Sequence, residues 1–191
     1  RTAVQKALEA RDAHEDLKKD RQVTYIEEEL EHSATAIILS VQSLEAYING
    51  VAQEKLPDYW ENLEKANIRA KWQTVPHLVT GEKVFEPGDP AFGKFTRAVK
   101  CRNRIVHFKK DTEEFVERSD YGYVSPVIKY ANHREAYKAV SAVKEMIEQF
   151  SEVRNEATPD WVTSNLWIHG NNPGDIDEPL DFDYWVSADK Y

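Results

Sequence analysis

Apolar residues recur at the spacing of one helical face along most of the chain. Four long helices are predicted, over residues 2–19, 22–55, 90–108 and 132–155. Asn132 is a candidate N-cap of the last one, and two shorter helices, separated near Asn67, are expected before Gly81. Residues 119–127, SDYGYVSPV, are expected to form a turn. The pattern therefore predicts an all-α protein, an up-and-down bundle of about five main helices.

The composition changes after Ala157, where Trp, Asp, Pro and Gly become frequent. We expect a short helix near residues 159–167 and then an extended acidic tail. The chain is therefore divided into a helical bundle, residues 1–157, and a C-terminal extension, residues 158–191, packed on or trailing it. The tail is interpreted as a solvated appendage. The alternative is that its carboxylates mimic phosphates and lie over a basic helix of the bundle.

Charge is unevenly distributed along the sequence. The net charge is −9, which argues against a general affinity for nucleic acid. Residues 94–110, however, hold seven bases and no acid. The protein is therefore acidic overall but contains one strongly basic segment, which distinguishes it from a uniformly acidic protein.

The sequence indicates no membrane span, metal or cofactor. No apolar run approaches the roughly 20 residues that a membrane span requires, and the six histidines are scattered without metal-ligand spacing. The single cysteine, Cys101, fits a reducing compartment. We therefore expect a cytoplasmic protein with no metal site and no cofactor.

Two charged residues interrupt apolar helical faces. At about 100° per residue, Arg102 falls near the middle of the apolar side of helix 90–108, whereas Asn103 and His107 lie on an exposed stripe. Glu45 interrupts the apolar stripe of the longest helix in the same way. Because an unpaired buried charge is costly, we expect these helices to pack together with Arg102 and Glu45 meeting or nearly meeting. Periodicity alone favours a structural buried ion pair, and the alternative is a shared polar pocket.

The sequence RNRIVH, residues 102–107, resembles the signature of the HEPN superfamily (higher eukaryotes and prokaryotes nucleotide-binding domains). That signature is an arginine, usually followed by a polar residue, and a histidine after a short spacer, towards the end of a late helix in a small α-helical bundle. The segment SLEAYINGVAQEKLP, residues 43–57, is similar to the second helix of several bacterial HEPN families. The resemblance covers roughly residues 20–150 and includes the helix order.

This resemblance implies a metal-independent endoribonuclease that cleaves single-stranded RNA through the ribose 2′-hydroxyl, with a toxin, defence or RNA-processing role. It implies that Arg102 stabilises phosphate charge, that His107 transfers the proton and that Asn103 orients the reacting groups. Glu45 is expected to position Arg102. The basic residues expected to bind RNA are Lys100, Arg104, Lys109 and Lys110.

The resemblance also implies partners. HEPN ribonucleases commonly dimerise around one composite site. On an ideal helix the side chains of Arg102 and His107 point about 140° apart, so that one helix does not easily place both on one phosphate. A twofold partner, or fraying of the helix near Phe108, removes that difficulty. An antitoxin or regulatory protein is a further expected partner. Lys109, however, stands where toxins paired with a nucleotidyltransferase antitoxin commonly have a modified tyrosine. The alternative function is a non-catalytic HEPN protein that binds RNA or a protein partner.

Overall fold

The structure is a computed structural model that describes residues 2–20, 23–107, 116–118, 122–124 and 126–163. Its long helices are α1 (Thr2–Asp20), α2 (Val23–Lys55), α4 (Ile68–Thr80), α5 (Pro90–Val106) and α6 (His133–Val153). The short elements are η1 (Pro57–Tyr59), α3 (Trp60–Glu64), β1 (Val116–Arg118), β2 (Gly122–Val124), η3 (Pro126–Lys129) and α7 (Asp160–Thr163). The described residues are thus helical apart from one pair of short strands, and the all-α prediction is confirmed.

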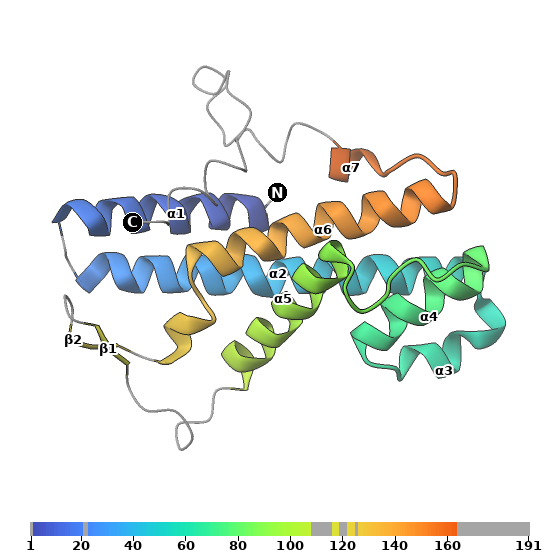
Figure 1. Cartoon of the computed structure of the whole chain (residues 1–191), viewed down its shortest axis with the longest axis horizontal. Helices are drawn as coiled ribbons and strands as arrows, with labels where there is room; N and C mark the ends of the chain where they lie inside the picture. Colours follow the sequence, from blue (N-terminus) through green and yellow to red (C-terminus); the bar gives the residue numbers. More distant parts are fainter. Residues whose placement is uncertain (1, 21–22, 108–115, 119–121, 125, 164–191) are drawn as a thin grey trace.

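Helix α2 lies at the centre of the bundle (Figure 1). It packs against α1, α4, α5 and α6, and α6 also packs against α1, α5 and α7. Figure 1 shows α1 running back along α2, α6 running obliquely over α2, and α5 inclined steeply to α2. The predicted packing of the longest helix against the helix with the RNRIVH sequence is therefore confirmed.

An aromatic cluster fills the core between α2 and its neighbours. Trp72 of α4 is fully buried, and its ring contacts those of Phe85, Phe95 and Phe150 at centroid distances of 5.4, 6.1 and 6.1 Å. The Trp72 indole Nε1 donates a hydrogen bond to the carbonyl oxygen of Leu44, at 3.3 Å. Since a buried indole N–H requires an acceptor, this bond fixes α4 against one point of α2.

Local side-chain caps explain where several helices begin. The side chains of Asn67, Asp89 and Asn132 accept hydrogen bonds from backbone N–H groups in the first turns of α4, α5 and α6. Helix α4 ends at Gly81, whose φ of 77° lies in the left-handed region that glycine adopts without strain. The prediction of Asn132 as an N-cap is confirmed.

The predicted turn over residues 119–127 is wrong in part. Strands β1 and β2 form an antiparallel pair in which Val116 lies opposite Val124 and Arg118 opposite Gly122. Three residues per strand are too few for alternation to be recognised in the sequence. The acidic tail and the end of the helix expected near 159–167 lie outside the described residues, whereas α7 packs on α6 through the buried Val162.

Glu135 of α6 forms the main polar link between α5 and α6. Its carboxylate accepts hydrogen bonds from Arg97 Nε at 2.6 Å, from Lys138 Nζ at 3.2 Å and from the Cys101 thiol at 3.3 Å. Burial by itself raises the pKa of Glu135, but the hydrogen bond from Arg97 and the charge of Lys138 outweigh it and hold the pKa below its ordinary value of 4.5. Glu135 is therefore a charged carboxylate that stabilises the fold at neutral pH.

Replacement of Glu135 by alanine is expected to lower the free energy of unfolding by about 2 kcal/mol at pH 7, because a buried ion pair loses one partner while Arg97 stays partly hydrated. Glu148→Ala is the matched control on the same helix, since Glu148 is more exposed and pairs with Lys144 at 3.9 Å, and it should change stability by less than about 0.5 kcal/mol. Denaturant unfolding measures both. Equal losses in the two variants would contradict the role of Glu135.

The same network predicts a pH dependence. Because the folded-state pKa of Glu135 lies below 4.5, its stabilisation is present above pH 4.5 and is lost as the pH falls through the folded-state pKa. The stabilities of wild type and Glu135→Ala should therefore converge in that acidic range. A difference that stays constant from pH 7 down to strong acid would contradict the charged state assigned to Glu135.

Candidate functional site

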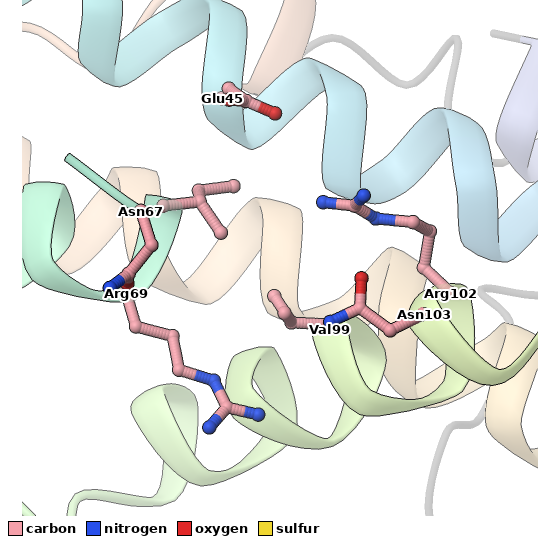
Figure 2. Close-up of a pocket in the computed structure, with 7 residues that line it drawn as sticks. Glu45, Asn67, Arg69, Val99, Arg102 and Asn103 are labelled. Carbon is pink, nitrogen blue, oxygen red and sulfur yellow. The ribbon is translucent and has the colours of Figure 1, made fainter. Parts of the chain in front are cut away.

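A polar pocket lies where α2, the start of α4 and α5 meet (Figure 2). Its volume is about 470 Å³, within the range of about 300–1,000 Å³ that is usual for ligand sites. The residues that line it are Glu45, Asn67, Ile68, Arg69, Val99, Arg102 and Asn103. Three of the residues singled out in the sequence, Glu45, Arg102 and Asn103, therefore lie in one place.

Arg102 and Glu45 face this pocket from opposite helices. Figure 2 shows the Arg102 guanidinium extending from α5 towards α2, and the Glu45 carboxylate extending from α2 on the same side. Both residues are half-buried. Within the part of the chain that the structure describes, no hydrogen bond or ion pair joins Arg102 to Glu45. Of the two arrangements considered for these charges, the structure has the shared pocket, since both side chains line it.

Arg69 is a pocket residue that the sequence did not reveal. It lies in the first turn of α4, is exposed, and donates a hydrogen bond from Nη2 to the carbonyl oxygen of Thr96 on α5, at 3.1 Å. An arginine near a predicted helix start is common and has no distinguishing sequence pattern. Arg69 reaches the pocket only because α4 packs beside α5. With Arg69 and Arg102 against Glu45, the charged groups of the pocket sum to one positive charge.

His107 lies apart from the pocket. It is the C-cap of α5, its backbone N–H donates to the carbonyl oxygen of Asn103 at 2.9 Å, and its side chain is exposed. Asn103 and His107 are both exposed, as expected, but the expectation that Asn103 points away from Arg102 is wrong, because the two residues line the pocket together. The structure thus brings together Glu45, Arg102 and Asn103, and leaves His107 at the end of the helix.

The basic residues of α5 fall into two groups. Lys94 pairs with Glu145 and Arg97 with Glu135, so two of these cations link α5 to α6. The second group has exposed side chains and includes two predicted RNA contacts, Lys100 and Arg104. The guanidinium of Arg104 lies 5.6 Å from the centre of the Tyr130 ring. The other two predicted RNA contacts, Lys109 and Lys110, lie outside the described residues.

Neither a metal cluster nor a reactive cysteine is found among the described residues. Across residues 2–20, 23–107 and the described segments up to 163, no group of three His, Cys, Asp or Glu side chains could hold a metal ion. Burial and the nearby charge of Glu135 raise the pKa of the Cys101 thiol to about 12, so Cys101 is a protonated core residue and a poor nucleophile. In the same described part of the chain, no helix combines the length and apolar character needed to cross a membrane.

Compared with known protein families, with curated proteins and with solved structures, the chain matches none of them. A function for this protein therefore has to be argued from the side chains of the pocket and from the exposed end of α5.

The half-exposed state of the pocket charges predicts mild effects on stability. Glu45→Gln and Arg102→Gln should each change the free energy of unfolding by less than about 1 kcal/mol, the usual scale for charges that remain hydrated. Denaturant unfolding with circular dichroism checks this. A loss near 3 kcal/mol in either variant would instead mean that the two charges form a buried, coupled pair.

Proposed function

We propose that this protein is a metal-independent endoribonuclease of the HEPN type that cleaves single-stranded RNA. The observation that supports it is the state of Arg102, which extends into a pocket of net positive charge and makes no ion pair with any described residue. A guanidinium that lines a pocket between helices, and that has no ion-pair partner among the described residues, suits an anionic ligand. The RNRIVH sequence supplies the reaction class, and the all-α bundle is compatible with it.

The residues suit cleavage by the ribose 2′-hydroxyl. In that reaction the 2′-oxygen attacks the adjacent phosphorus and loses its proton, while the P–O5′ bond breaks and the 5′-oxygen gains a proton. The products are a 2′,3′-cyclic phosphate and a free 5′-hydroxyl. His107 is the group that moves a proton near neutral pH. Arg102 stabilises the charge that develops on the phosphoryl oxygens, and Asn103 orients the phosphate.

The separation of Arg102 from His107 within one chain supports a homodimer as the active form. The end of α5 also exposes an apolar residue, Val106, at 53% of its surface. Two copies packed with the ends of their α5 helices near a twofold axis would cover Val106 and bring the His107 of one copy towards the Arg102 of the other. Closed twofold dimers are the commonest oligomers.

A non-catalytic HEPN protein is the second candidate. The observation that favours it is the same distance between the pocket and His107, because a module that only binds RNA or a protein partner needs no histidine beside the arginine. Lys109, in place of a modifiable tyrosine, disfavours regulation by a nucleotidyltransferase antitoxin. A toxin, defence or RNA-processing role belongs to the first candidate, and other antitoxin or regulatory proteins are compatible with both.

Loss of the histidine distinguishes the two candidates. His107→Ala should reduce cleavage of labelled single-stranded RNA by at least about 100-fold, the usual contribution of a general acid or base. EDTA should have no effect, and DNA, which lacks the 2′-hydroxyl, should stay intact. His77→Ala is the matched control, because His77 is an exposed histidine on α4. Equal cleavage by His107→Ala and wild type would exclude the proposed chemistry.

Complementation between variants tests the composite site. Arg102→Ala and His107→Ala homodimers should each be inactive, whereas a mixture that exchanges subunits should regain activity, because each mixed dimer has one intact Arg102 and one intact His107 from different chains. Light scattering should find a dimer at micromolar concentration, and Val106→Asp should shift it towards monomer. A wild-type monomer that cleaves RNA would refute the dimeric site.

A further inference from the structure

The pocket contains a carboxylate as well as two guanidinium groups, and a simple phosphate site does not require the carboxylate. Glu45 would repel a phosphate and weaken its binding to Arg69 and Arg102. A ligand that uses all three groups must offer anionic oxygens to the arginines and N–H or O–H donors to Glu45, because an ionised carboxylate only accepts hydrogen bonds. A nucleotide has both kinds of group.

The arrangement of the three charges fits one nucleotide within a strand. Figure 2 shows Arg102 and Arg69 on different sides of the pocket, with Glu45 on α2 beyond the space between them. A nucleotide inside an RNA strand has one phosphate on its 5′ side and another on its 3′ side. Two separated guanidinium groups can therefore bind two successive phosphates while the base reaches the carboxylate, and guanidinium groups bind phosphate through pairs of N–H donors.

Glu45 further selects among the four bases. Guanine presents two adjacent donors on one edge, N1–H and the N2 amino group, which match the two oxygens of a carboxylate. Adenine and cytosine place an acceptor beside their amino donor, and uracil has a single N–H between two carbonyl oxygens. An acceptor in the position of the second donor would face a negatively charged oxygen, which is unfavourable.

We infer that this pocket binds a guanosine unit of single-stranded RNA, in which Glu45 accepts hydrogen bonds from N1–H and N2–H of guanine, Arg102 holds the 3′-phosphate and Arg69 holds the 5′-phosphate. The inference rests on the proposed function for RNA as the ligand, and it makes Glu45 and Arg69 specificity and positioning residues. If Arg102 holds the scissile phosphate, the protein cleaves on the 3′ side of guanosine.

Calorimetric titration with small nucleotides tests the pocket without any cleavage. The probes are guanosine 3′,5′-bisphosphate, adenosine 3′,5′-bisphosphate and guanosine 3′-monophosphate. Wild type should bind the guanosine bisphosphate at least about tenfold more tightly than the adenosine compound, the scale of one charge-assisted hydrogen bond. Equal affinity for the two bisphosphates would overturn the inference, and this comparison requires no variant.

Two variants then assign the individual residues. Glu45→Gln should abolish the preference for guanine. Arg69→Gln should lower the affinity for the guanosine bisphosphate about tenfold and leave the affinity for guanosine 3′-monophosphate unchanged. Lys65→Gln is the control, because Lys65 is an exposed cation just before α4 and does not line the pocket. A preference for guanine that survives Glu45→Gln, or a uniform loss of affinity for every probe in Arg69→Gln, would refute the assigned roles.

The inference and the proposed function can fail separately. If wild type binds guanosine selectively but cleaves no RNA, the ribonuclease proposal fails and the pocket assignment stands. If wild type cleaves RNA with no preference for guanosine on the 5′ side of the cut, the pocket assignment fails alone.

Discussion

Burial of the apolar stripe of α2 is the constraint on which the rest of the structure depends. Ile37, Leu44 and Ile48 are fully buried along this helix, and each such side chain contributes about 1.5–3 kcal/mol when it leaves water. Helix α2 has 33 residues and every other described helix is shorter, so no neighbour covers the whole stripe. The other four long helices therefore all pack against α2, and the positions of their side chains follow from that packing.

The pocket forms where this coverage is interrupted. Glu45 interrupts the stripe beside Leu44, whose carbonyl oxygen accepts the hydrogen bond from Trp72. Trp72 lies one helical turn after Arg69 on α4, so the buried indole fixes the position of the arginine relative to Glu45. On the other side, the bond between Arg97 and Glu135 fixes α5 against α6. Packing on both sides thus places the helical positions of three charged residues around one pocket.

Glu135 and Glu45 show two different uses of a carboxylate at a helix interface. Glu135 is buried and accepts hydrogen bonds from Arg97, Lys138 and Cys101, so its charge is neutralised within the fold. Glu45 is half-buried and faces Arg102 across the pocket without a bond to it. Protein groups satisfy the first carboxylate, whereas the second stays open to water or to a ligand. This contrast locates the candidate site at Glu45.

The sequence by itself determined the helices, because helix boundaries depend on local periodicity and on caps such as Asn132. It also identified Glu45 and Arg102 as charges within apolar stripes, and hence which two helices meet. Only the tertiary structure decided that these charges face a pocket without pairing, that Arg69 lies beside them, and that Glu135 is the buried partner of Arg97. The physical reason is that crossing angles and the reach of side chains depend on how all the helices pack on α2 together, and a single helical pattern contains no such information.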